Sequence, residues 1–357
     1  SEMCIRDRLG NGNGTFQSAT TYGVDTFPQS LAVADFNGDG KPDLAVATSS
    51  WSIWILLGRG DGTFQTSFQV PYQQISFVVV GDFNGDGKLD LAAAGSTVSI
   101  LLGDGNGSFA VAASYGVRSG PIAVGDFNGD GKLDLAVADV GSNNVSILLG
   151  NGDGTLQTQV TYGVGSSPQS VALGDFNGDG RPDLALANYG SNNISILLGN
   201  GNGMFQAPVS YGVGSNPYSI ALADFNGDGK ADIAVANYGS NNISILLGNG
   251  NGTFQVSARY GTGASPRAVA IGDFNVDGRP DIAIADYGSN DVRILLGNGD
   301  GSFQAATRYA TGYYPSSVAV GDFNGDGKPD LAVMNPGAGA EGKPSALSVL
   351  LGNGDGT

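Results

Sequence analysis

The sequence predicts an all-β fold, a seven-bladed β-propeller of four-stranded antiparallel blades. A motif of the form Asp-Phe-Asn-Gly-Asp-Gly recurs seven times at intervals of 44 to 49 residues, and a second motif of the form Leu-Leu-Gly-Asn-Gly-Asp-Gly-Thr-Phe alternates with it. Each repeat holds four strand-length segments separated by turn residues, and none shows a sustained helical period. A repeat of about 40 to 50 residues with four strands is typical of a propeller blade.

The repeat at 155–204 illustrates the four segments, which are 156–162, 170–176, 184–187 and 194–198. The first segment mixes polar and apolar residues, whereas the other three are largely apolar. A strand that is apolar on both faces has to be covered on both sides, while a more polar strand suits an outer edge. We therefore expect stacked blades with the polar segment outermost.

The two ends of the chain are expected to complete one blade together. Residues 15–22 read as a lone outer strand, and residues 317–351 read as three strands without an outer one. The N-terminal strand would then close the ring, residues 9–357 would form a single propeller, and deleting residues 1–24 would lower the melting temperature.

The first eight residues share nothing with the repeats, so 1–8 is expected to be a non-native or disordered leader. Because the chain stops inside a motif at Thr357, a fragment of a longer protein is expected.

Each acidic loop carries oxygen-bearing side chains at positions 1, 3, 5 and 9, as in Asp35 to Asp43. Calcium takes six to eight oxygen ligands, and glycine at position 6 permits a sharp bend. The main-chain carbonyl of the Lys, or Arg, at position 7 is the expected backbone donor. Each loop is thus predicted to hold one calcium ion, up to seven in all. The predicted ligands are Asp35, Asn37, Asp39, Lys41, Asp43, Asp82, Asn84, Asp86, Lys88, Asp90, Asp126, Asn128, Asp130, Lys132, Asp134, Asp175, Asn177, Asp179, Arg181, Asp183, Asp224, Asn226, Asp228, Lys230, Asp232, Asp273, Asn275, Asp277, Arg279, Asp281, Asp322, Asn324, Asp326, Lys328 and Asp330.

The loop begins like an EF-hand but ends differently. Position 12 is apolar, as in Val46, so the bidentate Glu of an EF-hand is missing and the loop is expected to link two strands. A metal-free Asx turn is the alternative, and seven intact copies argue against it. In the sixth loop Val276 replaces glycine at position 4 while the ligands are complete, so we expect a site that is kept but binds more weakly.

The charge of the chain is concentrated in these loops. They hold 21 of the 33 acidic residues, and the remaining acidic residues are outnumbered by the 16 Lys and Arg, although the formal net charge is −17. Metal binding is therefore expected to couple to folding. The negative charge argues against nucleic acid, and no apolar run is long enough to cross a bilayer. With one cysteine, Cys4, and no histidine, an intrachain disulfide, a Cys/His zinc site and imidazole catalysis are excluded.

The repeat Asp-Phe-Asn-Gly-Asp-Gly-Lys-x-Asp-Leu-Ala-Val, followed by Leu-Leu-Gly-Asn-Gly-Asp-Gly-Thr-Phe, resembles the FG-GAP/VCBS repeats best known from integrin α-chain propellers. The resemblance covers 9–357. It implies a seven-bladed propeller with calcium in loops between the first and second strands of the blades. It also implies a secreted, extracellular or cell-surface protein used in adhesion or ligand recognition. Integrins fill only some blades, whereas all seven loops match here.

The face opposite the calcium loops is expected to bind a protein or carbohydrate ligand. Its turns carry Tyr189, Tyr238 and Tyr287, beside asparagines such as Asn192 and Asn241. Flat apolar rings next to amides suit both kinds of ligand. Ordinary turn residues are the alternative interpretation.

Three functions compete. The favoured one is a monomeric, non-enzymatic, calcium-stabilised module for adhesion or ligand recognition, and the second is a calcium-dependent lectin. The third, a polysaccharide- or lipid-cleaving enzyme, is disfavoured because histidine is absent and no carboxylate pair stands outside the repeat pattern. Five irregularly placed arginines indicate either an anionic ligand or plain surface charge: Arg118, Arg259, Arg267, Arg293 and Arg308.

Overall fold

The computed structural model describes residues 4–7, 20–23, 28–48, 52–60, 63–71, 75–117, 120–322, 326–337 and 346–357. All of its regular elements are β-strands, and the described residues contain no helix. Accordingly, no helix in this part of the chain could span a membrane.

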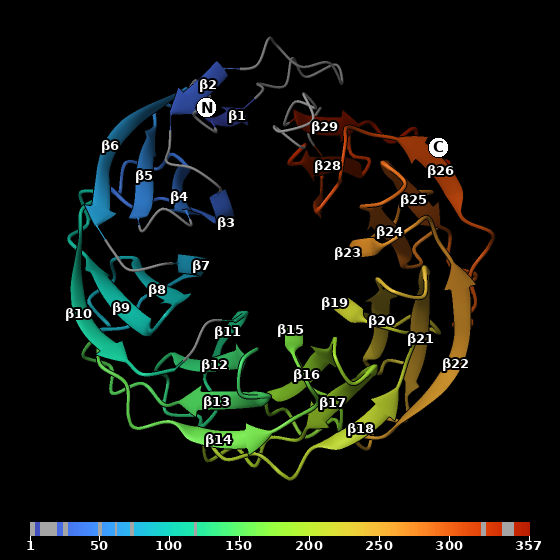
Figure 1. The fold of residues 1–357 in the computed structure, drawn as a ribbon, viewed down its shortest axis with the longest axis horizontal. Helices are drawn as coiled ribbons and strands as arrows, with labels where there is room; N and C mark the ends of the chain where they lie inside the picture. The colour runs from blue at the N-terminus through green and yellow to red at the C-terminus, as the bar shows by residue number, and fades with distance from the viewer. Residues whose placement is uncertain are drawn as a thin grey trace. The chain divides into compact units, whose positions relative to one another are not determined.

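The strands form a series of antiparallel sheets, each ordered from its first to its last strand (Figure 1). The first three complete sheets are β3 (Pro28–Ala34), β4 (Asp43–Thr48), β5 (Ser52–Gly58) and β6 (Phe64–Pro71); β7 (Ile75–Gly81), β8 (Asp90–Gly95), β9 (Val98–Gly103) and β10 (Phe109–Tyr115); and β11 (Ile122–Gly125), β12 (Asp134–Asp139), β13 (Asn144–Leu148) and β14 (Val160–Gly163).

The next three sheets are β15 (Pro168–Gly174), β16 (Asp183–Asn188), β17 (Asn193–Leu197) and β18 (Val209–Gly212); β19 (Pro217–Ala223), β20 (Asp232–Asn237), β21 (Asn242–Gly248) and β22 (Phe254–Gly261); and β23 (Pro266–Gly272), β24 (Asp281–Asp286), β25 (Asp291–Leu295) and β26 (Thr307–Ala310). The seventh sheet contains β27 (Ser317–Gly321), β28 (Asp330–Asn335) and β29 (Ala346–Leu350). The predicted fold class is confirmed: the chain is an all-β, seven-bladed β-propeller built on four-stranded antiparallel blades.

Burial explains the strand composition. In β8, β12, β16, β20 and β24, the second strands of their sheets, every residue is buried. The fourth strands β14 and β18 are mostly exposed. The core therefore lies between neighbouring sheets, as where Ile53 and Ile55 of β5 cluster with Leu91 of β8. Apolar sequence on both faces predicted this correctly.

The expected segments match the strands, with one shorter element. Residues 156–162 were expected to form one strand, but β14 begins only at Val160. Leu156 makes an isolated bridge with Gly150 and is buried. The chain therefore leaves the sheet after this bridge and rejoins it at the start of β14.

Cys4–Asp7, which belong to the expected non-native or disordered leader, form strand β1, which pairs with β2 (Thr20–Gly23) through the register Cys4↔Gly23. Residues 15–19 of the predicted closing strand lie outside the described part of the chain, so ring closure stays a prediction.

The chain divides into two compact units. Unit 1 comprises Ser1–Arg8, Ala19–Leu173 and Gly199–Ala207, and unit 2 comprises Leu9–Ser18, Gly174–Leu198 and Pro208–Thr357. The first three acidic loops belong to unit 1 and the last four to unit 2.

Candidate functional site

Each acidic loop connects the first and second strands of its sheet, as predicted. Position 9 is the first residue of the second strand in every sheet, from Asp43 at the start of β4 to Asp330 at the start of β28. All seven of these aspartates are fully buried: Asp43, Asp90, Asp134, Asp183, Asp232, Asp281 and Asp330. A carboxylate buried without hydrogen bonds would be costly, so its partners define its role.

The position 9 carboxylate joins two backbone segments. In the fifth loop, Phe225 donates its N–H to Asp232 Oδ2 at 2.9 Å, and Gly248 donates its N–H to Asp232 Oδ1 at 2.7 Å. Phe225 belongs to the loop itself, whereas Gly248 ends the third strand. The same pair of bonds is made by Asp43, Asp90, Asp134 and Asp281. The sequence suggested only a metal ligand here and missed this structural role.

The carboxylates at positions 1 and 5 fold back on their own loop. Asp224 Oδ2 accepts the N–H of Gly229 at 2.7 Å, and Asp228 Oδ1 accepts the N–H of Lys230 at 3.0 Å. Asn226 Oδ1 accepts the N–H of Asp228 at 3.0 Å. The ammonium of Lys230 lies 3.0 Å from Asp228 Oδ2. These contacts fix the loop as a sequence of Asx turns.

Among the described residues, no group of three or more acidic side chains is arranged to hold a metal ion. The chemistry of the donors nonetheless fits a hard cation, because each loop offers carboxylate, amide and carbonyl oxygens. In the first loop, the negative charges of two carboxylates also act on the third. Burial is the main cause that raises the pKa of Asp43, and repulsion from Asp39 and Asp35 raises it further, against hydrogen bonds from Gly58 and Phe36.

The sixth loop is strained where it departs from the others. Val276 has a φ of 55°, in the left-handed region that glycine occupies at this position in other loops, as in Gly227 with a φ of 72°. The Gly227 N–H donates to Asp224 Oδ1 at 2.8 Å, whereas the Val276 N–H contacts the main-chain oxygen of Asp273 at 3.4 Å. The valine therefore weakens the turn that presents the first ligand. Weaker metal binding there remains a prediction.

The second glycine-rich motif bonds to the preceding sheet, as the turn between the third and fourth strands of the sixth sheet illustrates. Gly301 donates its N–H to the carbonyl of Phe225 at 3.0 Å, and the ring of Phe303 packs edge-on against Phe225 with centroids 5.3 Å apart. The Phe303 N–H donates to Tyr260 Oη at 3.0 Å. The glycines of this turn adopt the left-handed conformation, with a φ of 79° at Gly299 and 82° at Gly301.

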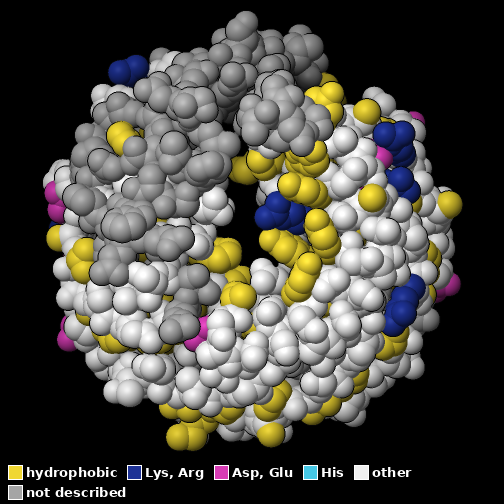
Figure 2. All heavy atoms as spheres, in the orientation of Figure 1, with side chains coloured by type: hydrophobic (Ala, Val, Ile, Leu, Met, Phe, Trp, Pro, Cys, Tyr) yellow, Lys and Arg dark blue, Asp and Glu magenta, His cyan; other side chains and the backbone are white. Residues whose placement is uncertain are grey.

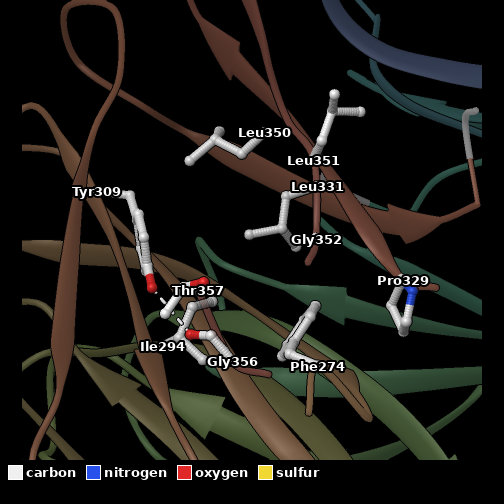
Figure 3. Close-up of a pocket in the computed structure, with 10 residues that line it drawn as sticks. All are labelled: Phe274, Ile294, Tyr309, Pro329, Leu331, Leu350, Leu351, Gly352, Gly356 and Thr357. Atoms are coloured by element: carbon white, nitrogen blue, oxygen red, sulfur yellow. Dashed lines mark hydrogen bonds between the residues drawn. The ribbon is translucent and has the colours of Figure 1, made fainter. Parts of the chain in front are cut away.

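A pocket of about 60 Å³ lies at the corresponding position beside the seventh sheet (Figure 3). Phe274, Tyr309 and Leu350 are among its lining residues, and Tyr309 Oη donates to the Gly356 carbonyl at 2.8 Å. Phe274 and Tyr309 correspond to the Phe225 and Tyr260 that hold Phe303. The pocket therefore belongs to the packing between sheets.

At the other end of the sheets, unit 2 holds a group that we call the Tyr–Arg cluster. Three of its tyrosines directly follow second strands, one tyrosine and the arginine are the second residues of the first strands β19 and β23, and the last tyrosine lies in the turn before β27. The members are Tyr189, Tyr218, Tyr238, Arg267, Tyr287 and Tyr314, all half-buried. Figure 2 shows hydrophobic side chains gathered around β19 and β23, with a basic side chain among them.

The rings of the cluster form a continuous series. Centroid distances are 6.3 Å for Tyr189 and Tyr238, 6.4 Å for Tyr238 and Tyr287, and 5.0 Å for Tyr287 and Tyr314. Tyr218 lies 6.2 Å from Tyr189. The structure thus brings the three predicted ligand-binding tyrosines together and adds two more.

The neighbouring asparagines have a different role. Asn192 Oδ1 accepts the N–H of Asn216 at 2.8 Å, and Asn241 Oδ1 accepts the N–H of Ser265 at 2.7 Å. They connect the turn of one sheet to the entry of the next. For these two side chains the interpretation as ordinary turn residues holds.

The arginines noted in the sequence differ in the groups that they contact. Arg259 donates to the Val213 carbonyl at 2.9 Å, and Arg293 and Arg308 pair with acidic side chains. Arg267 instead lies between two tyrosines, with its Cζ 5.2 Å from the ring centroids of Tyr218 and Tyr287. Arg118 lies outside the described residues.

The sixth sheet contains a buried carboxylate pair that sequence reasoning missed. Asp286 and Asp291 are 0% and 1% exposed, and Arg293 Nε lies 3.3 Å from Asp286 Oδ2 and 3.6 Å from Asp291 Oδ1. Burial, with a contribution from Asp291, raises the pKa of Asp286 to about 7. Comparing repeats would have found it, because Asn188 and Asn193 occupy these positions in the fourth sheet.

With this geometry described, comparison with known proteins decides the family. The FG-GAP-like repeat matches at residues 6–46, 35–93, 82–137, 126–186, 175–235, 224–284 and 273–333. The chain belongs to the FG-GAP-like repeat family. The resemblance inferred from the motifs is thereby confirmed. No curated protein matches this FG-GAP-like chain in sequence.

Solved structures share the fold of this FG-GAP-like protein at low identity. An Agrocybe aegerita lectin studied for its recognition of non-reducing terminal N-acetylglucosamine has 17% identity and a TM-score of 0.59, with 98% of this chain and 96% of that chain covered. The periplasmic gluconolactonase of Pseudomonas aeruginosa has 16% identity and a TM-score of 0.61, covering 96% and 94%. A candidate 6-phosphogluconolactonase of Bacteroides uniformis has 16% identity and a TM-score of 0.61, covering 87% and 93%.

These lactonases correct one prediction. The sequence-based conclusion that the chain is not an enzyme was wrong, because structures of an enzyme class share its fold. The absence of histidine excluded imidazole chemistry only, and a propeller can host other chemistries on its loops. At these identities the likeness shows the fold and assigns no activity.

Proposed function

We propose that this FG-GAP-like propeller is a calcium-stabilised recognition module that binds carbohydrate at the Tyr–Arg cluster. The observation that carries the proposal is the continuous series of half-buried tyrosine rings at the end of the sheets opposite the acidic loops. Sugar rings stack on aromatic faces, and tyrosine hydroxyls offer hydrogen bonds to sugar hydroxyls. The lectin that shares this fold is consistent with the proposal.

Calcium is proposed for the acidic loops on the chemistry of their donors. In five of the loops the position 9 carboxylate is close enough to two further carboxylates for their charges to raise its pKa; these are the loops of Asp43, Asp90, Asp134, Asp232 and Asp281. A divalent cation would offset this repulsion and would add links between oxygens of one loop. Its role would be to stabilise the loop, while the cluster recognises the ligand.

One cluster residue has a bulky side chain at a left-handed turn position that the preceding repeats also have. Tyr314 has a φ of 59°, where the equivalent residues of the preceding sheets are Asn216 and Ser265. Left-handed backbone is costly for a bulky side chain and concentrates at binding sites. In this conformation the Tyr314 ring lies against Tyr287.

A glycan array read with and without a calcium chelator tests the proposal, with Tyr238→Ala and Tyr287→Ala as variants. We expect binding of at least one saccharide, with at least about a tenfold loss in each variant, since stacked aromatic side chains are often dominant contacts. The matched control is Tyr313→Ala, which removes a 43% exposed tyrosine outside the cluster and should leave binding unchanged.

Adhesion to a protein is the second candidate, because the same cluster suits a protein interface. No saccharide binding, together with capture of a protein partner that depends on Tyr238, would favour it. An extracellular or cell-surface location is proposed with either function, since weak calcium sites fill at the calcium levels found outside cells.

A further inference from the structure

Arg267 lies in the cluster, and none of the residues that the structure describes gives it an acidic partner. Its Nη2 donates to Tyr218 Oη at 3.1 Å, and its guanidinium is flanked by the rings of Tyr218 and Tyr287. Among the described residues, no carboxylate lies within ion-pair distance of Arg267, whereas two lie near Arg293 and one lies near Arg308. A half-buried cation without a counter-ion is unusual in a chain with a net charge of −17.

The flanking rings hold the guanidinium in place. A cation–π contact at an exposed site is weaker than a charge-assisted bond to a carboxylate. The ring contacts therefore orient Arg267 without satisfying its charge. One recorded hydrogen bond leaves most of its five N–H donors available.

The position of Arg267 in the repeat carries no basic residue in the two preceding sheets. The second residue of the first strand is Gln169 in the fourth sheet and Tyr218 in the fifth. The backbone of β23 thus does not require a cation at this position. The Arg267 side chain is therefore explained better by ligand binding at the cluster than by the needs of the strand.

We infer that the cluster binds an acidic saccharide, with Arg267 pairing with the carboxylate of a uronic-acid residue that stacks on the tyrosines. The inference rests on the proposed carbohydrate-binding function and names the class of sugar. A planar guanidinium matches a carboxylate through two parallel N–H···O bonds, which an ammonium group does not reproduce. Tyr238 and Tyr287 supply the apolar surface beside it.

Calorimetry with tetragalacturonate and with its fully methyl-esterified form tests the inference, using the full chain in calcium. The esterified form keeps the sugar rings and removes the charge. We expect the acidic form to bind about ten- to a hundredfold more tightly, the range of a lost charge-assisted hydrogen bond. Arg267→Gln should remove this preference, and Arg267→Lys should restore only part of it.

Arg59→Gln is the matched control, since it removes one positive charge from an exposed arginine that has no acidic partner within the described residues. It should leave the preference intact. Far-ultraviolet circular dichroism and melting curves establish that each variant is folded. If Arg267→Gln does not fold, Arg267→Lys is the deciding variant. A preference of Arg267→Lys for the acidic saccharide that equals the wild-type preference overturns the inference.

The outcomes separate the two claims. Equal binding of both saccharides overturns the acidic-sugar inference and leaves carbohydrate recognition intact. Absence of binding to these and all other saccharides overturns both. If the chain binds poly-glutamate through Arg267 and binds no saccharide, the inference of a saccharide ligand is overturned in favour of an acidic peptide.

Discussion

At the scale of the residue, the position 9 aspartate shows how one side chain serves two purposes. Asp232 is fully buried and accepts one N–H from its own loop and one from the end of the third strand. Its remaining lone pairs are the ones that a cation could use. A carboxylate satisfies both N–H groups, which an apolar residue could not, and so the aspartate has a reason to be there even without metal.

The first prediction concerns Val276, which holds a left-handed conformation that disfavours L-residues by about 1 to 2 kcal/mol. Val276→Gly removes this strain, but glycine gains conformational freedom in the unfolded chain, which offsets about 0.5 to 1 kcal/mol. We expect a net increase of about 0.5 to 1 kcal/mol in the free energy of unfolding, measured by denaturant melts in a chelator.

The reverse substitution is its control. Gly227 has the same backbone conformation, and an added Cβ would meet nothing closer than 3.9 Å, so Gly227→Val changes strain without a clash. It should destabilise the chain. Identical stability of both variants and the wild type would contradict the account of the strain.

The second prediction concerns pH and Asp286. Its pKa is raised from 3.8 to about 7, so the folded state favours the neutral acid while the unfolded chain ionises near 3.8. The stabilising contribution of the neutral acid is complete below pH 3.8 and is lost as the pH rises to about 7. By the conversion of 1.36 kcal/mol per pKa unit, the loss is about 4 kcal/mol at most.

Asp286→Asn tests this, because Asn188 and Asn237 occupy the same position in the preceding two sheets. The variant should have a flatter dependence of unfolding free energy on pH between 4 and 7 than the wild type. Parallel curves would show that Asp286 does not titrate in this range. Asp355→Asn, at an exposed turn, serves as the control.

At the scale of the element, the connections between strands do more than join them. In the fifth sheet the position 9 side chain connects the first turn to the end of the third strand, and the glycine-rich turn bonds to the preceding sheet. The aromatic side chain after that turn, such as Phe254, packs on Phe176 at 5.3 Å. Neighbouring sheets within a unit are thereby linked through hydrogen bonds as well as apolar contact.

The third prediction tests this link in the third loop. Asp134 accepts N–H groups from Phe127 and Gly150, so Asp134→Asn leaves one buried N–H without an acceptor. The expected cost is about 1 to 3 kcal/mol of unfolding free energy, even in a chelator. Asp130→Asn alters an exposed carboxylate of the same loop and should cost much less under these conditions.

The comparison is informative because both residues are proposed calcium ligands. Equal effects of Asp134→Asn and Asp130→Asn in a chelator would show that the buried hydrogen bonds contribute little. In calcium both variants should also lose metal-dependent stability.

At the scale of the whole molecule, charge dominates the expected response to calcium. The seven loops hold 21 of 33 acidic residues, while the net charge is −17. Crowded carboxylates destabilise the folded state, and a cation that binds only that state stabilises it by mass action. The folded protein should therefore depend on divalent ions more than on ionic strength.

The fourth prediction follows. Calcium at about 100 times the dissociation constant should add about 2.7 kcal/mol per independent site to the free energy of unfolding, and so raise the melting temperature. Scanning calorimetry against calcium concentration measures this, with magnesium and sodium at matched ionic strength as controls. A melting temperature that is the same in calcium and in chelator would overturn the proposed metal sites.

The lactonases that share the fold show that the composition of the whole chain is a weak guide to catalysis. Residue types excluded one class of catalyst, but a propeller carries function on its loops and strand ends, and enzymes and a lectin use the same scaffold. The carboxylate pair of Asp286 and Asp291 shows why composition was a poor guide, since the pair is visible only when repeats are compared position by position.

The number of repeats, the strand order within each sheet and the placement of the acidic loops between first and second strands could all be predicted from the sequence. These features depend on local signals, namely turn residues at fixed spacing and apolar runs that need cover on both faces. Which side chains meet across repeats became visible in the folded structure. It placed Tyr189 beside Tyr238, flanked Arg267 with two tyrosines, and gave Asp232 its two backbone partners, because such contacts join residues that are distant in sequence and depend on how neighbouring sheets pack.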